Sequence, residues 1–508
     1  MVAFLIGNKG RAGLLHAVLP ALFFVCTGVL PAAEDLEAKS RRAKSLLESG
    51  RFEEAIPICK ELVAALPGNP GLVLNLGLAE HMAGHEKEAI TAFEAVLKTQ
   101  PKALPALVSL GAARLSLKQP GLAVSPLQRA LAVDPNNQDA RGMLAASLNA
   151  TGQLDASARE YRKLTELSPY DPRAWHGLGI TYQAIASDAF ERLRKANPQS
   201  GFVASLLADT RVQKHQYRSA FYFFSEALKQ LPAVHGIHPA MAEVYRKTGH
   251  PDWAATEDAR EQAMLPAVCP AHPGECQFLA GHDLEALELP KNITPEALYW
   301  RAKAANELSL QSLVRLGQLP PSPELHQVRA EIARDQNQPL EAIKEWRAAL
   351  ALAPGNPGLQ RELAISCFLA NDYRTAVTEI EKSLLLEPRA ADLNFALGDS
   401  WLHLEDPEKA VPYLRTALVA DPKMLAADAS LGLSLSRLGK FAEAVPHLEK
   451  ARELDEDGSL NYQLGRAWQA AGNAAAAKTA MARYEEIQKL NQKQKEEAAL
   501  ETRIIPPQ

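Results

Sequence analysis

Residues 175–182 read WHGLGITY and fit the pattern W-x2-L-G-x2-Y, with Trp175, Leu178, Gly179 and Tyr182 at its fixed positions. We interpret this stretch as the first of two helices in a small unit. Gly179 stands midway along it, where a second helix would cross so closely that a larger side chain would push the pair apart. Glycine weakens the helix there, but the close crossing gains packing contact. The stretch therefore predicts a pair of tightly packed helices.

Prolines recur through the chain at a fixed interval. In three runs, each proline lies 34 residues after the one before: Pro67, Pro101, Pro135 and Pro169; Pro198, Pro232 and Pro266; Pro320, Pro354, Pro388 and Pro422. Proline cannot donate a backbone hydrogen bond or continue a helix, so each one ends its unit. A period of this size is typical of a helical unit that cannot bury its own apolar face and stacks on copies of itself.

The second half of the unit has the pattern A-x3-F followed by proline, as in Ala89, Phe93 and Pro101. Together the two halves resemble the tetratricopeptide repeat, a helix-turn-helix unit of 34 residues. The resemblance implies an all-α fold, namely an α-α superhelical solenoid of about a dozen such repeats. It also implies a concave face, lined by the first helix of each repeat, that binds extended peptides or helices.

Laid along the chain, the repeat predicts an N-terminal array at 34–268, an interruption at 269–293 and a C-terminal array at 294–491. Two repeats are short, at 172–200 and near 294–322, and we expect a shortened second helix in each.

The C-terminal region predicts one continuous helix from Ala474 to about Leu500. Met481, Tyr484 and Ile487 form an apolar stripe along it that can cover the last repeat. The polar C-terminal tail, 492–508, then completes a solubilising cap.

Composition and charge are those of an ordinary soluble protein, with 47% hydrophobic residues and a net charge of −5. Nucleic-acid binding needs a basic stripe, so we expect no nucleic-acid partner. Residues 1–33 predict an export signal, because Lys9 and Arg11 precede an apolar run that ends at the small residues Ala32 and Ala33. The alternative is a retained membrane anchor. Both interpretations place the repeats outside the cytoplasm, in a bacterial periplasm or cell envelope.

Cys269 and Cys276 flank the loop CPAHPGEC inside the interruption. An exported protein meets oxidising conditions, so we expect a disulfide across this loop, with free thiols as the alternative. A zinc site would combine the two cysteines with His272 and His282, but their spacing matches no known zinc pattern. We therefore expect no metal and no other cofactor.

Catalysis is not expected. The chain contains no G-x-S-x-G elbow, phosphate-binding glycine loop or H-E-x-x-H pair. The repeats also leave no separate domain for an enzyme, so no small-molecule substrate is expected.

Candidate groove residues follow from spacing, because the fifth, ninth and twelfth positions of each unit should project to the concave face. In the early repeats these positions are apolar: Leu74, Leu78, Val108, Ala112 and Leu115. In the later repeats they are charged: Asp209, Glu243, Arg246, Glu331, Arg334, Arg361 and Asp399. The alternative for the apolar set is burial between neighbouring repeats.

The sequence as a whole predicts a non-enzymatic scaffold that binds a protein or peptide in its groove. The alternative is an accessory subunit of an enzyme complex in secretion, envelope assembly or polysaccharide export, whose activity resides in another chain.

Overall fold

Helices make up the regular structure of this protein. The computed structural model describes residues 31–288, 294–501 and 504–507, and no strand occurs among them. Most of the predicted export signal, 1–30, therefore lies outside the described residues. Among the described helices, none combines the length and the apolar character that a membrane crossing requires.

Two compact units are present. The first contains the described residues up to Ala189 together with Gly281–Glu288 and Arg301–Leu325. The second contains Phe190–Ala280, residues 294–300, and the described residues from His326 onward. Both units take residues from either side of the interruption, so they divide the chain differently from the expected arrays at 34–268 and 294–491.

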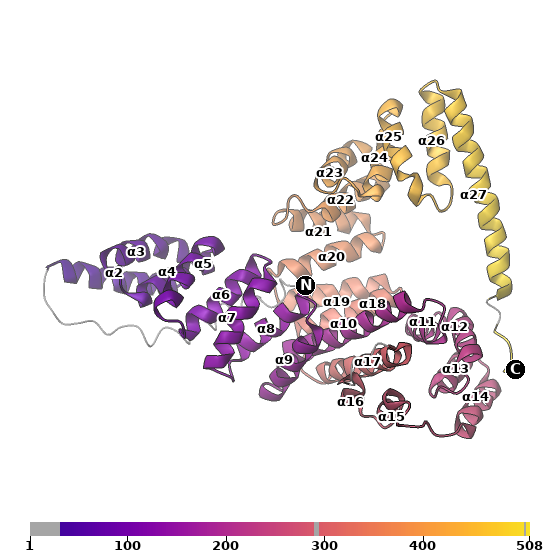
Figure 1. Cartoon of the computed structure of the whole chain (residues 1–508). Coiled ribbons are helices and arrows are strands. Elements are labelled where there is room, and N and C mark those ends of the chain that lie inside the picture. Colours follow the sequence, from indigo (N-terminus) through magenta and orange to yellow (C-terminus); the bar gives the residue numbers. More distant parts are fainter. Residues whose placement is uncertain (1–30, 289–293, 502–503, 508) are drawn as a thin grey trace. The chain divides into compact units, whose positions relative to one another are not determined.

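The first unit is built mainly of helix pairs (Figure 1). Its helices are α2 (Pro31–Glu48), α3 (Phe52–Ala65), α4 (Pro70–Ala83), α5 (Glu86–Thr99), α6 (Leu104–Ser116), α7 (Pro120–Val133), α8 (Gln138–Ala150), α9 (Leu154–Leu167) and the short α16 (Asp283–Glu288). Three more helices have residues in both units: α10 (Pro172–Ala196), α17 (Pro295–Gly317) and α18 (Pro323–Asp335).

The second unit continues the same construction. Its helices are α11 (Gly201–Gln213), α12 (Tyr217–Gln230), α13 (Ile237–Lys247), α14 (Pro251–Ala263), α15 (Pro273–Leu279), α19 (Pro339–Leu352), α20 (Pro357–Leu369), α21 (Tyr373–Leu384), α22 (Ala391–His403), α23 (Pro407–Ala420), α24 (Leu425–Arg437), α25 (Phe441–Ala451), the 3-10 turn η3 (Arg452–Leu454), α26 (Ser459–Ala470) and α27 (Ala474–Glu501).

The pair α4 and α5 shows how local sequence sets the helix boundaries. Asn69 caps α4 by accepting hydrogen bonds from the backbone N–H groups of Gly71 and Leu72, and Pro70 occupies the first helical position. Gly84 ends α4 with φ of +89°, a conformation that a residue with a Cβ rarely adopts. Pro101 follows α5, where its missing N–H costs no helical hydrogen bond.

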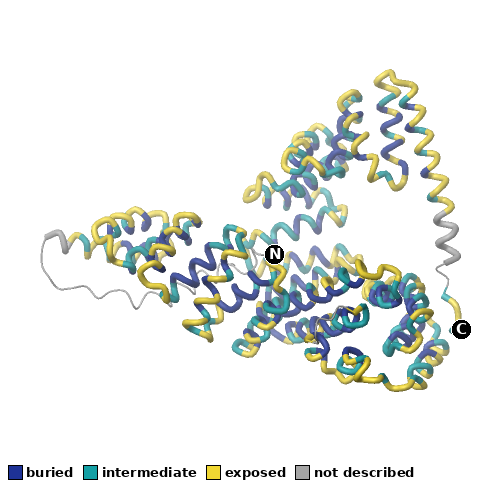
Figure 2. Tube along the Cα trace, in the orientation of Figure 1, coloured by how far each residue is buried: buried dark blue, intermediate teal, exposed yellow. Residues whose placement is uncertain are grey.

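Close helix crossings occur where the sequence places midway glycines. A Cβ on Gly111 of α6 would lie 2.5 Å from Leu127 Cδ2 on α7, and one on Gly398 of α22 would lie 2.6 Å from Leu414 Cγ on α23. Both leucines are fully buried. Figure 2 shows that buried residues lie mainly on the sides of the helices that face neighbouring helices, with exposed residues on the outer sides. Gly111 and Gly398 thus have the role that the sequence analysis predicts for a glycine midway along the first helix.

The two short repeats differ from the prediction. Instead of a first helix followed by a shortened second one, α10 and α17 are single continuous helices. The physical reason is visible in the sequence, because residues 183–187 and 305–309 contain neither glycine nor proline to end a helix.

The long helices pack on each other within the first unit. Ser309 Oγ of α17 donates to the carbonyl oxygen of Gly179 on α10 at 2.9 Å. A Cβ on Gly179 would lie 2.7 Å from Leu313 Cδ2, so this glycine makes a helix crossing with a partner that is distant in sequence.

The C-terminal helix is as predicted. α27 packs along α26, and a Cβ on Gly465 of α26 would lie 3.1 Å from Met481 Cγ (Figure 1). Tyr484 packs against Tyr462, with ring centroids 5.5 Å apart, and Ile487 is buried. The tail beyond α27 differs from a purely polar cap, because Ile504 packs against an apolar cluster of α11–α14.

Candidate functional site

The apolar groove predicted in the early repeats lies mostly in the protein core. Leu74, Val108, Ala112 and Leu115 are 2–6% exposed, and all four belong to one apolar cluster that spans α4–α8. Leu78 is half-buried against the same cluster. For the four buried residues the alternative interpretation, burial between neighbouring repeats, describes the structure.

Four charged positions of the later repeats lie on the successive first helices α18, α20 and α22, and we call them the charged ladder: Glu331, Arg334, Arg361 and Asp399. Arg334 of α18 donates to Glu362 of α20 at 3.3 Å. Arg361 of α20 donates to Glu387 at 2.9 Å and also pairs with Asp392 of α22. The links of Arg334 to Glu362 and of Arg361 to Asp392 thus join the first helix of one repeat to the next repeat, whereas Glu387 follows the second helix of Arg361's own repeat.

Asp399 continues the charged ladder from α22 to α24. It accepts a hydrogen bond from Ser430 Oγ at 2.6 Å, and its other carboxylate oxygen lies 3.5 Å from His403 Nε2. At the other end of the ladder, half-buried Glu331 accepts from Gln327 at 3.0 Å. Burial raises the pKa of the Glu331 carboxyl above its usual range.

Aromatic side chains that the spacing rule did not select lie beside Asp399. Tyr373, at the start of α21, stacks on His403 with ring centroids 4.4 Å apart and an interplanar angle of 1°. Burial, and then the charge of Asp399, raise the pKa of Tyr373. Phe368 packs edge-on against Phe395 at 5.9 Å. The spacing rule considered only first helices, and Tyr373 belongs to a second helix.

The charged ladder therefore offers a carboxylate beside stacked rings at Asp399, and two arginines with planar donor groups on the preceding first helices α18 and α20. Such a mixture can bind a peptide through charged side chains and backbone groups while aromatic rings cover its apolar parts. The links between repeats hold these groups in place before any ligand binds.

The remaining predicted groove residues, Asp209, Glu243 and Arg246, form a second group on α11 and α13. Arg246 is exposed and donates to Glu243 at 3.2 Å and to Asp258 of α14 at 2.8 Å. Asp209 is half-buried on α11. These pairs connect neighbouring turns of α13 and join α13 to α14.

Within the interruption, the structure joins Cys269 and Cys276 in a disulfide, with their Cα atoms 5.5 Å apart. The zinc alternative would have needed both sulfur atoms as ligands together with His272 and His282. Oxidation of the pair in the cell stays a prediction that a thiol assay tests.

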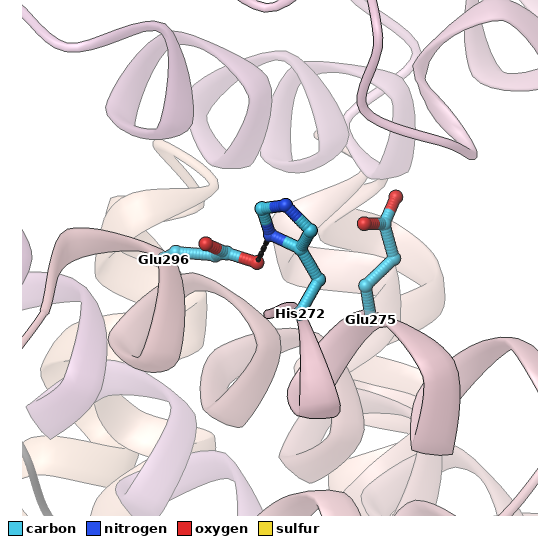
Figure 3. Close-up of side chains that lie close together, drawn as sticks. All are labelled: His272, Glu275 and Glu296. Carbon is cyan, nitrogen blue, oxygen red and sulfur yellow. Dashed lines mark hydrogen bonds and ion pairs between the residues drawn. The ribbon is translucent and has the colours of Figure 1, made fainter. Parts of the chain in front are cut away.

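Two side chains of this loop, His272 and Glu275, and Glu296 of α17 each offer one potential ligand atom, and these three atoms lie within 4.8 Å of one another (Figure 3). His272 Nδ1 is 2.8 Å from Glu296 Oε1, and this hydrogen bond raises the pKa of His272. Glu275 is buried and accepts the backbone N–H of His235 at 2.9 Å. Contacts within the protein thus use all three side chains.

Family comparisons match both halves of the chain. A model described as Tetratricopeptide repeat matches residues 46–113 and 114–179, and a second model of that description matches 328–384 and 370–424. The chain is 25% identical over 132 residues to the general transcriptional corepressor ssn6 of Schizosaccharomyces pombe. This match covers 25% of this chain and 12% of the corepressor. The chain is also 22% identical over 236 residues to the CTR9 homolog of Arabidopsis thaliana. This match covers 43% of this chain and 21% of the homolog. The matches span at most about a fifth of either relative.

Solved structures with partial similarity include MamA from Desulfovibrio magneticus RS-1, which is 21% identical to this chain. The match covers 33% of this chain and 95% of MamA, with a TM-score of 0.31. A repeat protein from Parabacteroides merdae is 13% identical over 66% of this chain and 99% of its own, with a TM-score of 0.32. YrrB is described as having an unusual peptide-binding site. It is 22% identical to this chain, and the match covers 37% of this chain and 83% of YrrB, with a TM-score of 0.27. All three TM-scores are below 0.5.

Proposed function

Because this chain is a tetratricopeptide-repeat protein, and such arrays serve as protein-interaction scaffolds, we propose that it is a non-enzymatic scaffold for an extended protein segment. The segment binds along the first helices α18, α20, α22 and α24. The observation that carries this proposal is the charged ladder: Arg334, Arg361 and Asp399 each contact the next repeat, and Asp399 lies beside the stacked rings of Tyr373 and His403.

The chemistry of the charged ladder defines the kind of partner. Arg334 and Arg361 attract acidic side chains, whereas Asp399 and Glu331 attract basic ones or peptide N–H groups. A partner segment with charges of both signs and at least one apolar or aromatic residue fits this order. Because the ladder residues are already paired within the chain, they lose little freedom on binding.

An affinity experiment with a charge reversal tests the proposal. Arg334 is exposed and its pair with Glu362 is a surface ion pair, so Arg334→Glu should leave the fold intact. The matched control is Arg374→Glu, which makes the same charge change at an exposed position on the second helix α21. Crosslinked capture from envelope extract should recover at least about fivefold less partner with Arg334→Glu than with the control.

Equal capture by both variants and the wild-type chain would exclude the charged ladder as the binding surface. If the captured partner were an enzyme of secretion, envelope assembly or polysaccharide export, the accessory-subunit function would be favoured over a general scaffold.

Location outside the cytoplasm is part of the proposal and is supported by the sequence of residues 1–33. Expression of the full chain followed by cell fractionation and N-terminal sequencing tests it. We expect a periplasmic product that begins close to Glu34, and a product that retains Met1 in the membrane fraction would favour the anchor.

A further inference from the structure

The last described residues of the chain lie against α13. Ile504 is half-buried on an apolar cluster of α11–α14 that includes Phe221, Met241 and Tyr245. The Tyr245 hydroxyl donates to the carbonyl oxygen of Ile505 at 2.9 Å. These two residues are 260 positions apart, so the contact is a tertiary docking contact between a helix and the end of the chain.

The tail itself has the properties of an extended ligand. Pro506 and Pro507 fix their own φ angles, and each also restricts the residue before it to extended conformations. A polyproline II segment repeats every three residues, so residues i and i+3 share one side. Ile504 and Pro507 are half-buried, whereas Ile505 and Pro506 between them are exposed. The tail therefore docks through one side of a stiff segment, which loses little conformational entropy on binding.

The α13 surface is suited to such a segment. The Tyr245 ring is buried and packs edge-on against Trp253 at 5.6 Å and at a tilt against Phe221 at 5.8 Å. This packing fixes the position from which its hydroxyl meets the tail. Aromatic surfaces with a donor aimed at a peptide carbonyl recognise proline-rich extended segments in general.

We propose that α13, with its neighbours α12 and α14, forms a recognition site for extended aliphatic-x-x-Pro segments, and that Ile504–Pro507 occupies this site in cis. The occupied site excludes a partner's segment of the same kind until that segment displaces the tail. Only two residues separate α27 from Ile504, so the end of the helix is held within about 10 Å of the site. This proposal concerns a surface other than the charged ladder and does not depend on it.

Two full-length variants test the cis occupancy. Ile504→Asp places a charge on the half-buried side of the tail and should release it, whereas the control Leu490→Asp places the same charge on an exposed side chain of α27, outside the tail. The probe is a fluorescein-labelled peptide of residues 499–508, followed by fluorescence anisotropy. Because a tethered tail competes at a high effective concentration, Ile504→Asp should bind the probe at least about tenfold more tightly than the wild-type chain or the control.

Adding Tyr245→Phe to the Ile504→Asp chain should weaken probe binding about fivefold, because the ring stays and only the hydrogen bond is lost. Circular dichroism verifies that the helices persist in each variant. The proposal is overturned if the probe binds no chain, or if it binds all chains equally. It is also overturned if light scattering shows a wild-type dimer that Ile504→Asp dissociates, because the tail then occupies the site of a second copy.

Discussion

Replacing Gly111 by alanine tests whether the close crossing of α6 and α7 needs a residue without a Cβ. The new methyl group would lie 2.5 Å from Leu127 Cδ2 and 2.6 Å from its Cγ, well inside an ordinary carbon contact of about 3.5–4.0 Å. Leu127 is fully buried, so it has little room to move. Overpacking of this kind costs about 2–3 kcal/mol, and the better helix propensity of alanine returns about 1 kcal/mol. We expect a net destabilisation of about 1–2 kcal/mol.

Gly121→Ala is the matched control, because it changes the partner helix α7 at a position where the new Cβ meets only Thr151 Cγ2 at 3.8 Å. This variant should be neutral or up to about 1 kcal/mol more stable. Urea unfolding followed by circular dichroism gives the stabilities, and hydrogen exchange of α6 and α7 amides localises the effect, because repeat arrays open locally. If Gly111→Ala proved as stable as Gly121→Ala, the close-crossing argument would be refuted.

Three further outcomes are expected. First, the carboxylate of Glu296 raises the pKa of His272 above 6.5. The pair therefore stabilises the fold at a pH below the pKa of His272 in the unfolded chain, and this stabilisation is lost as the pH rises through the pKa of His272 in the folded chain. Glu296→Gln should bring the His272 pKa back toward 6.5 in an NMR titration, and an unchanged titration would contradict the pairing. Second, the exported chain should show no reactive thiol at Cys269 or Cys276 until a reductant is added, and immediate labelling there would show free thiols. Third, burial raises the pKa of Glu331 above 4.5. The free energy of unfolding contributed at this site should therefore increase as the pH falls through the raised pKa toward 4.5. Glu331→Gln should remove this pH dependence from the urea midpoint, and an unaltered dependence of the midpoint on pH would contradict the reasoning.

The regular part of the fold was readable from the sequence because its signals are local. Asn69, Pro70 and Gly84 act on the backbone within one helix, and each appears in the structure at the boundary that its chemistry predicts. The long helix α10 was missed because the period was extended across residues 183–187, which lack any helix-ending residue. The lack of glycine and proline at 183–187 itself predicts a continuous helix.

The candidate site was less readable, because exposure depends on what packs over a residue. Leu115 and Asp399 follow the same spacing rule, yet Leu115 is core and Asp399 lies on the charged ladder beside Tyr373. Helical spacing gives the direction of a side chain within its own repeat, but a neighbouring repeat can cover that direction. Residue type decides the difference, since a charged side chain is rarely buried without a partner.

The places where the sequence leaves its 34-residue period coincide with contacts between distant parts of the chain. In a stacked array each helix pair contacts only its neighbours, so a local change spreads only to adjacent repeats. The hydrogen bond from Ser309 to Gly179 spans 130 residues, and that from Tyr245 to Ile505 spans 260. The second of these connects α13 to the end of α27, so any ligand that displaces the tail at α13 also frees the end of α27. If the proposed cis occupancy holds, a partner that binds at α13 releases the end of α27, which the regular array alone would leave unaffected.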